Sequence, residues 1–568
     1  MIINSNIQYQ QRNNNQKQPI NLGNNNSPQF KGVNTVFRFL ADEPVWGLTG
    51  VDLGSMVFPR TITDTKHRGA AAGFETGFRE GGSSANNALI GCYGVLAGAL
   101  IASTINKKHG IKANEIFASD EAIDIFSAKW KKHNGNIDSY AKDVVDSIKA
   151  YNPNSALADS KGFVSIPEAN KQAIVEDLKH IATGDTSTMK ARWKGTKDRL
   201  LTRIVEATGI ESSLKLENGA KATSANSKTM MENFYTLTKS FKSEKVGNNI
   251  DKFVKDYKHF GKMRTILGIS TALLIAMSAQ PLNVYMSKKR TGTDGFVGVE
   301  GRKKDDSTTF KVIKGASAAA MITMSLGYLG ALSKNPLKIP AKFIEKNQYK
   351  GKNPTMNMFK SVYGGAIASR MWVSRDKDEL REVCTKDVLG FFNWLMLGSV
   401  VNKIILHKFQ AKDANMLRKA PLEANEGFFY KRAGKKMRGV MDFLSSSIAS
   451  HTEVLMDGLK KERPDIKSVI KADGKPMKFN EMYKLLPKNG AARKNLRLLN
   501  LAQLGGYLYS GLVLGIGIPR LNIALTNHFD KKRKAKIQSQ QLVKPATINF
   551  LRAEIKDSNF GRLKSSKA

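Results

Sequence analysis

Cysteine, acidic residues and recognisable catalytic motifs are all scarce in this sequence. Its 568 residues include only 2 cysteines, too few for a disulfide framework, and Cys92 and Cys384 are expected to be free thiols in a reducing compartment. Asp and Glu number 49 against 90 Lys and Arg, which leaves a formal net charge of +41. So large a charge indicates a polyanionic neighbour such as anionic lipid, nucleic acid or an acidic protein.

No sequence motif identifies a reaction. The 8 histidines are scattered, and no pair has the spacing of metal ligands. Zinc-protease, C-x-x-C and calcium-loop patterns are absent, as are the nucleophile-elbow, Walker A and dinucleotide-binding patterns. The sequence therefore predicts no catalytic residue, no metal site and no cofactor. The expected class is a non-enzyme, and an active site assembled only in three dimensions stays open as an alternative.

An apolar signal-peptide core is also lacking at the amino terminus. Residues 1–31 are rich in Asn and Gln, and such a tract cannot bury enough surface to offset its ordering entropy. We expect this tail to be disordered, so that a later, internal segment would have to direct entry into a membrane.

Five stretches stand out against the charged background because none contains Asp or Glu: residues 88–105, 265–286, 316–333, 388–401 and 499–519. A helix that crosses a bilayer needs about 20 apolar residues, with a lower limit near 17. The fourth stretch reaches that limit only when it is extended through Lys403. Buried core helices of a soluble protein are the competing interpretation. Without acids inside the stretches, a scaffold or passive pore is favoured over an ion-coupled transporter.

Small residues recur within these stretches. Gly94 and Gly98 form one G-x-x-x-G pattern, and Gly511 and Gly515 form another. Such spacing lets helix backbones approach closely in lipid, so these glycines are candidate helix-packing positions. The spacing also arises by chance in any helix rich in Gly and Ala. A glycine-rich run at residues 69–82 predicts either a close helix contact or a mobile lead-in to the first stretch.

The second and fifth stretches resemble each other. Each contains a proline, Pro281 or Pro519, which is expected to end or kink the helix, and then a Leu-Asn-aliphatic triplet and a basic cluster. An internal duplication and chance similarity both explain the likeness. The clusters are candidate contacts for lipid head groups; alternatives are a solvated terminus or a nucleic-acid patch. They consist of Lys288, Lys289, Arg290, Lys531, Lys532, Arg533 and Lys534.

The sequence therefore predicts an all-α, membrane-associated protein with about five apolar helices and helical polar domains. Lys and Arg flank the apolar stretches almost equally on both sides, so no orientation follows. The expected divisions are a disordered tail (1–31), a lead-in and first apolar helix (32–105), a helical polar domain (106–260), membrane-associated helices (261–406), a basic helical insert (407–497), the last apolar helix (498–530) and a basic tail (531–568).

The expected function is that of a multi-pass structural or scaffold protein, placed in the cell membrane. Its basic regions would contact anionic lipids, and its further partners would be other copies of the chain or other membrane proteins. Two alternatives remain open: a transporter or pore, and a soluble basic helical protein that binds nucleic acid.

Overall fold

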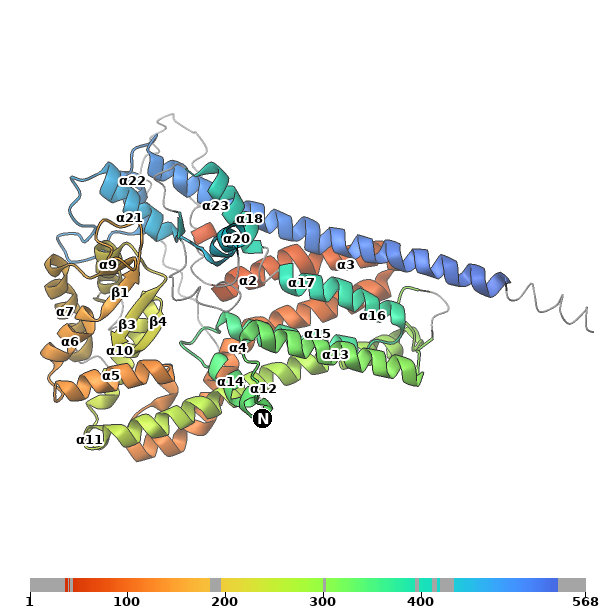
Figure 1. Ribbon diagram of the computed structural model, residues 1–568, viewed down its shortest axis with the longest axis horizontal. Helices are drawn as coiled ribbons and strands as arrows, with labels where there is room; N and C mark the ends of the chain where they lie inside the picture. Colours follow the sequence, from red (N-terminus) through yellow and green to blue (C-terminus); the bar gives the residue numbers. More distant parts are fainter. Residues whose placement is uncertain are drawn as a thin grey trace, which may run out of the picture.

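The computed structural model describes residues 36–38, 40, 44–183, 196–299, 303–393, 398–410, 416–418 and 434–539. The expected disordered tail and residues 540–568 of the basic tail lie outside this part of the chain. In the described part, a long bundle of helices carries globular domains at one end (Figure 1).

The bundle is built from segments that run back and forth along its long axis (Figure 1). In chain order they are α2 (Pro44–Asp52), η1 (Leu53–Val57) and α3 (Phe58–Arg68); α4 (Ala70–His109); α12 (Ile250–Thr291); α13 (Thr308–Leu329); α15 (Met356–Trp372); α16 (Lys377–Val383), η4 (Cys384–Val388), α17 (Leu389–Phe392) and α18 (Gly398–Phe409); and α23 (Ala491–Tyr509) with η7 (Ser510–Gly517) and a helix over 518–539.

Local sequence explains where several of these helices begin and end. Asn249 caps α12 by accepting a hydrogen bond from the Lys252 backbone N–H, and Ser307 caps α13 in the same way. Gly292 ends α12 with a φ of 69°. In this left-handed region glycine carries no Cβ penalty, so it is a common last residue of a helix.

The larger globular domain connects α4 to α12. Its helices are α5 (Asp120–Lys132), α6 (Ile137–Asp146), α7 (Glu168–Thr183), α9 (Thr196–Thr208), α10 (Ser227–Phe241) and α11 (Glu244–Gly247). They pack around an antiparallel sheet of order β2-β1-β3-β4, formed by β2 (Phe163–Ser165), β1 (Ile148–Tyr151), β3 (Leu214–Asn218) and β4 (Lys221–Ala225). The sequence analysis did not predict this sheet.

A smaller domain lies between α18 and α23. It contains α20 (Lys435–Ser445), α21 (His451–Glu462), α22 (Phe479–Leu485) and the two-stranded pair β5 (Leu417–Arg418) and β6 (Ser447–Ile448). Its core includes Leu455, Leu459 and Phe479 and continues into Leu496 and Leu499 of α23. The last bundle helix and this domain therefore share one hydrophobic core.

The all-α class is confirmed, since helices dominate and strands are few. Among the described residues, four helices are long and apolar enough to cross a membrane: Ala70–His109, Ile250–Thr291, Thr308–Leu329 and Ala491–Ser539. They contain the first, second and fifth apolar stretches, and the third as far as Leu329. The fourth falls in the short helices α17 and α18, and residues 394–397 of it are outside the described part.

The prolines do not end their helices, which was one of the two outcomes expected from sequence. α12 continues through Pro281 to Thr291, and the last bundle helix continues through Pro519 to Ser539. Both helices therefore reach the far end of the bundle, where their basic clusters lie (Figure 1).

Candidate functional site

Acidic and basic side chains gather inside the bundle where α3, α4, α15, α16 and η4 meet. We call this group the charge cluster. It has four bases and four acids, so that its formal charges cancel, and each member is no more than 8 % exposed: Arg60, Arg370, Arg375, Lys386, Glu75, Glu80, Glu379 and Asp387. Side chains of these types are rarely buried without partners. How they are paired therefore matters for the stability of the bundle.

The hairpin of α3 and α4 supplies three members of the cluster. Gly69 turns the chain between the two helices with a φ of 86°, a value that glycine adopts readily. The turn sets Arg60 of α3 beside Glu80 of α4, and Glu75 lies nearer to the turn. Residues 20 positions apart in sequence thus become neighbours through one tight connection.

The two hairpin helices approach closely because glycines face threonines. A Cβ added to Gly73 would lie 1.8 Å from Thr65 Oγ1, and one added to Gly77 would lie 3.2 Å from Thr61 Oγ1. Of the two interpretations of the glycine-rich run at residues 69–82, the structure therefore supports the close helix contact.

The connection between α15 and α16 supplies a further three members. Asp376 caps α16, because its carboxylate accepts hydrogen bonds from the backbone N–H groups of Asp378 and Glu379. The Arg375 backbone N–H donates to Glu379 Oε2 at 2.6 Å. This cap fixes Arg375 and Glu379 side by side, with Arg370 one turn earlier at the end of α15.

Glu80 is the acidic centre of one half of the cluster. Its carboxylate oxygens lie 3.3 Å from Arg60 Nη1, 3.3 Å from Lys386 Nζ and 3.7 Å from Arg370 Nη2. Arg370 Nη1 in turn lies 3.0 Å from Asp387 Oδ2. Arg79, outside the cluster, also donates from its Nε to Glu80 Oε1 at 3.3 Å. Four bases thus surround one acid, and Asp387 offsets part of the excess positive charge.

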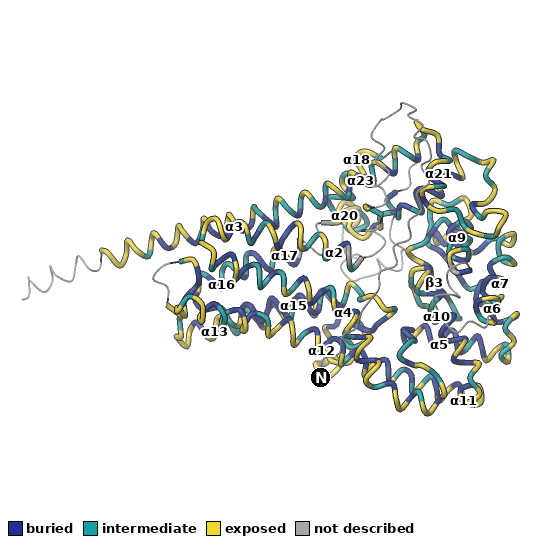
Figure 2. Tube along the Cα trace, turned by 180° about the vertical axis from the view of Figure 1, so that it is seen from behind, coloured by how far each residue is buried: buried dark blue, intermediate teal, exposed yellow. Residues whose placement is uncertain are grey.

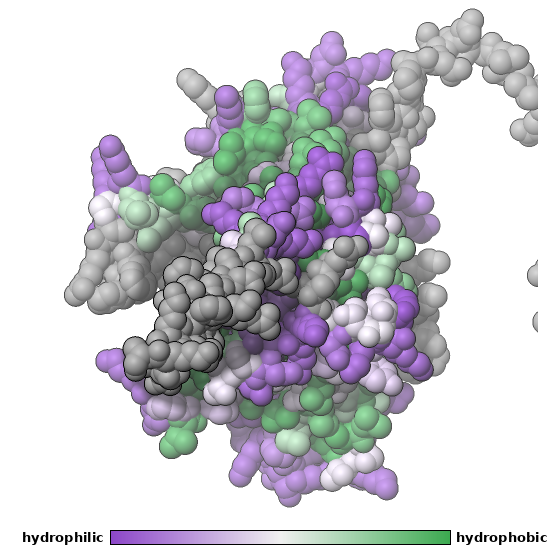
Figure 3. All heavy atoms as spheres, turned by 90° about the vertical axis from the view of Figure 1, so that its right-hand side faces the viewer, coloured by the Kyte–Doolittle hydropathy of each residue, from purple (hydrophilic) through white to green (hydrophobic). Residues whose placement is uncertain are grey.

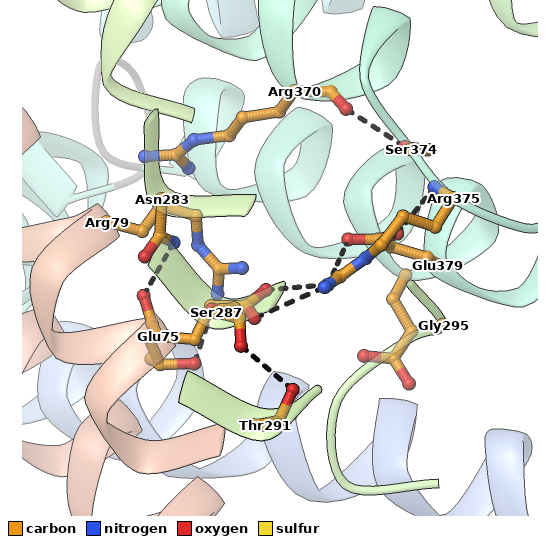
Figure 4. Close-up of polar contacts among 12 residues, drawn as sticks. Glu75, Arg79, Asn283, Ser287, Thr291, Gly295, Arg370, Ser374, Arg375 and Glu379 are labelled. Carbon is orange, nitrogen blue, oxygen red and sulfur yellow. Dashed lines mark hydrogen bonds and ion pairs between the residues drawn. The ribbon is translucent and has the colours of Figure 1, made fainter. Parts of the chain in front are cut away.

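Arg375 is the basic centre of the other half. Its Nη2 donates to Glu75 Oε1 at 2.7 Å and to Glu379 Oε1 at 2.8 Å, and its Nε donates to Glu379 Oε2 at 2.9 Å. Figure 4 shows the guanidinium between the two carboxylates. Charge-assisted hydrogen bonds of this kind are stronger than neutral ones and fix both partners.

Several polar atoms in the first half have ion-pair neighbours but no hydrogen-bond partner in the protein. They are Nη1 and Nη2 of Arg60, Nη1 of Arg370 and both carboxylate oxygens of Asp387. A buried charged group left without hydrogen bonds costs more than about 1–3 kcal/mol. These atoms therefore offer donors and acceptors to water or to a small solute.

A narrow cleft of about 30 Å³ borders the cluster, enough for about two water molecules. Phe296 and Val297, from the loop after α12, close part of it and are themselves buried. The Phe296 ring lies 5.1 Å from the Arg68 guanidinium carbon and 5.7 Å from that of Arg375. The polar lining comprises Arg60, Asp64, Arg68, Glu75, Thr76, Arg79, Glu379, Glu382, Lys386 and Asn522.

Two asparagines occupy similar positions at the edge of this site. Asn283 Nδ2 donates to the backbone carbonyl of Glu75 at 2.9 Å, and Asn522 Nδ2 donates to that of Glu382 at 3.4 Å. Both side chains are at most 2 % exposed, and the Oδ1 atom of each lacks a hydrogen-bond partner. These are the asparagines of the two Leu-Asn-aliphatic triplets. The similarity between the second and fifth apolar stretches therefore indicated two residues that border the site.

Three π-helical segments lie next to the cluster: Leu53–Val57, Cys384–Val388 and Ser510–Gly517. The second contains Lys386 and Asp387. The third supplies the Leu514 carbonyl, which accepts a hydrogen bond from Arg60 Nε at 3.0 Å. π-Helical turns are rare in proteins, and those that occur are often found at functional sites. Their convergence here favours a functional role for the cluster.

The predicted packing glycines lie at helix crossings elsewhere in the bundle. A Cβ added to Gly94 would lie 2.3 Å from the Tyr349 ring, and one added to Gly98 would lie 3.0 Å from Arg264 Cδ. Gly515 faces the Ser55 carbonyl at 2.2 Å from its added Cβ, whereas Gly511 has nothing nearer than 3.9 Å. A larger residue would therefore collide at Gly94 and Gly515 and would be tightly packed at Gly98.

The predicted head-group residues lie at the far end of the bundle and are not part of the cluster. Lys288 pairs with Asp294 at 2.8 Å, and the Arg290 guanidinium carbon lies 3.6 Å from the Phe74 ring centroid. Arg533 and Lys534 both pair with Asp530. The exposed residues of both clusters are Lys288, Lys289, Arg290, Lys531, Lys532 and Lys534.

The charge cluster itself was not predicted. Its carboxylates lie outside the uncharged stretches, on the polar start of α4 and on α16 and η4, and folding brings them into the bundle. The apolar stretches on which the preference for a scaffold or passive pore was based therefore do not include these acids. Among the described residues no group of His, Cys, Asp and Glu is arranged to hold a metal ion. Comparison with protein-family models, curated proteins and solved structures finds no match to this chain.

Proposed function

We propose that the chain is a multi-pass protein of the cell membrane that conducts a proton or another small ion through the polar interior of its helical bundle. The observation that carries this proposal is a charged interior enclosed by helices whose outer faces are apolar. The sequence favoured a scaffold or passive pore over an ion-coupled transporter because the apolar stretches contain no acids, and the acids of the charge cluster lie outside those stretches.

The outer faces of the bundle expose large apolar side chains. Between 22 % and 39 % of the residues in the apolar windows of the four long helices are buried, so most of each window is half-buried or exposed (Figure 2). In the described residues of the larger globular domain, by contrast, Leu157 is the one large apolar side chain that is strongly exposed. α12 alone exposes Met263, Leu267, Leu274, Ile275, Met277, Leu282 and Tyr285.

The length of this apolar surface suits a bilayer. From Met263 to Tyr285, α12 advances about 33 Å at 1.5 Å per residue, and the hydrocarbon core of a bilayer is about 30 Å thick. Looking onto the far end of the bundle, Figure 3 shows hydrophilic side chains near the middle, with hydrophobic ones above and below them.

The charge cluster lies within that apolar thickness. On α4, Glu80 comes between the exposed Phe74 and Leu89, about 9 Å along the helix from Phe74. Charged side chains at such depth cost several kcal/mol each unless they are paired, and they usually mark ion pathways or proton relays.

Two short helices support the placement of one membrane surface. α14 (Ile339–Lys346) and α20 contain no buried residue, and both combine apolar with basic side chains. Amphipathic basic helices of this kind lie in the head-group region of anionic membranes. The clusters at Lys288–Arg290 and Lys531–Lys534 would meet the head groups of the opposite surface.

A structural role in the membrane is the second candidate. The mutual pairing of the cluster and the close glycine-mediated crossings of α4 favour it, because both stabilise a fixed bundle. In that case the partners would be anionic lipids and other copies of the chain, and no ion would pass.

Extraction and flux measurements separate these possibilities. Embedding requires that carbonate and high salt leave the full-length protein in membranes and that detergent releases it. Release without detergent would contradict embedding and favour the nucleic-acid-binding alternative.

For conduction, the protein is reconstituted into phosphatidylcholine–phosphatidylglycerol liposomes that contain a pH-sensitive dye, and a potassium diffusion potential drives proton entry. We expect wild-type flux above that of empty liposomes, and a loss of about tenfold or more in Glu80→Gln, since one lost charge in a relay exceeds 1.4 kcal/mol. The matched control is Asp251→Asn, whose side chain is 80 % exposed. Absence of proton, sodium, potassium and chloride flux in an embedded protein would leave the structural role.

A further inference from the structure

A second cavity lies away from the charge cluster, where α18 and α23 of the bundle meet α21. Its volume is about 210 Å³, which is enough for several water molecules or one small organic molecule. One wall is apolar and includes Leu406, Leu499 and Ala502; the other carries His451, Asn402 and Gln503. No Asp, Glu, Lys or Arg is among the described residues that line it.

His451 lines this cavity and has one ring nitrogen without a hydrogen-bond partner. Its side chain is fully buried, and its Nε2 lies 2.8 Å from Asn500 Oδ1. An amide oxygen only accepts hydrogen bonds, so Nε2 carries the proton and Nδ1 is the acceptor. Burial lowers the pKa of His451, which keeps the ring neutral at pH 7. Nδ1 has no hydrogen-bond partner in the protein.

Two amide oxygens in the lining also lack a hydrogen-bond partner. Asn402 Oδ1 and Gln503 Oε1 are buried atoms without a hydrogen-bond partner. The lining hydroxyls already use their protons, because Ser212 Oγ donates to Glu453 and Ser450 Oγ donates to Glu211, each at 3.2 Å. The polar wall therefore combines these acceptors with the amide N–H donors of Asn402 and Gln503, and it suits a ligand whose groups both donate and accept hydrogen bonds.

We infer that this cavity binds a neutral polyhydroxylated molecule. Its hydroxyl groups donate to His451 Nδ1, Asn402 Oδ1 and Gln503 Oε1, and its C–H face packs against the apolar wall. An ammonium ion would be buried without a carboxylate to pair with, and a carboxylate or phosphate would be buried without a Lys or Arg to pair with, since none is among the described lining residues; both are costly. The ligand is either a free sugar or polyol or the head group of a neutral glycolipid, since both present the same hydroxyls.

The test uses full-length protein purified in octaethylene glycol monododecyl ether, a detergent without a sugar head group. Equilibrium binding is measured with D-glucose, D-mannitol and glycerol, and then in nanodiscs with and without monoglucosyl diacylglycerol. Saturable binding of a soluble probe identifies a free polyol as the ligand, and binding only in glycolipid nanodiscs identifies the head group. Binding of no probe in either arm overturns the inference and leaves a water-filled cavity only.

Two variants place the binding at this cavity. Ala502→Leu fills it, and Gln503→Leu removes one acceptor at nearly constant volume; each is expected to weaken binding at least tenfold. Asn495→Leu is the control, because Asn495 is on the same helix and is not among the lining residues. Size-exclusion profiles show whether each variant is folded, and Gln503→Leu decides if Ala502→Leu is not. Unchanged affinity in folded Gln503→Leu protein would place the probe elsewhere and overturn the inference.

Discussion

The guanidinium of Arg370 lies 3.0 Å from the carboxylate of Asp387, and neither side chain is more than 2 % exposed. The pair joins α15 to η4 in the centre of the bundle. Because both charges are removed from water, the loss of one partner leaves the other buried and uncompensated.

We therefore expect Asp387→Ala to lower the free energy of unfolding by about 3–5 kcal/mol, the usual cost of breaking a buried pair. The double variant Arg370→Met, Asp387→Leu should be more stable than Asp387→Ala alone, because no unpaired charge remains. Denaturation in detergent measures both effects. A double variant less stable than the single one would show that the pair is not the source of the effect.

The crossing of α4 near Tyr349 gives a second prediction. Gly94→Ala places a Cβ 2.3 Å from the Tyr349 ring, so we expect a loss of about 1–3 kcal/mol from overpacking. The matched control is Gly82→Ala on the same helix, where no atom lies within 4 Å of the added Cβ. That change should stabilise by about 0.5–1 kcal/mol through helix propensity. Melting temperatures that move in the same direction for both variants would contradict the close contact between Gly94 and Tyr349.

His451 predicts a dependence of stability on pH. Burial lowers its folded pKa, although the hydrogen bond with Asn500 opposes this, and the ordinary value is 6.5. Below that value the unfolded chain binds more protons than the folded one. The contribution of His451 to the free energy of unfolding is therefore complete above pH 6.5. It declines as the pH falls below 6.5, with a slope of at most about 1.4 kcal/mol per pH unit.

Thermal unfolding between pH 5.5 and 7.5 checks this prediction, and His451→Gln should flatten the profile. The control His67→Gln, at an exposed position of α3, should keep the wild-type slope. An identical slope in wild type and His451→Gln would assign the pH dependence to other groups.

The loop residue Phe296 gives a prediction for ion movement, which rests on the proposed function. Its ring closes the cleft beside Arg68 and Arg375, so Phe296→Ala should widen the cleft and raise proton flux several-fold in liposomes. Phe58→Ala, at a position 62 % exposed on the outer face of α3, is the control and should leave flux unchanged. Equal flux in wild type and Phe296→Ala would show that this ring does not limit passage.

The long apolar helices could be predicted from sequence because their uncharged runs exceed the length of a bilayer core. Other bundle helices escaped prediction because they carry charges in their interior. α3 contains Arg60 and α15 contains Lys360 and Arg370, and a hydropathy pattern alone assigns such residues to the surface. The fourth apolar stretch stays a prediction, because residues 394–397 of it lie outside the described residues.

The strands and the charge cluster escaped for related reasons. β3 alternates buried and partly buried residues, but five residues are too few for a period to be distinguished from a helical segment. Arg375 and Glu75 are 300 positions apart, and no local pattern indicates that they meet. The Leu-Asn-aliphatic triplets were the one visible sign, because Asn283 and Asn522 both border the cluster.

One continuous helix, Ala491–Ser539, carries Gln503 at the polyol cavity and Asn522 at the ion-paired interior. The two side chains stand about 28 Å apart along its axis at 1.5 Å per residue. Between them lies Ser510–Gly517, whose wider turns are where a helix can take up torsion without breaking. A rotation imposed on α23 by an occupant of the cavity is thus either transmitted to Asn522 or absorbed in that stretch, whose torsional stiffness sets the communication between the two ends.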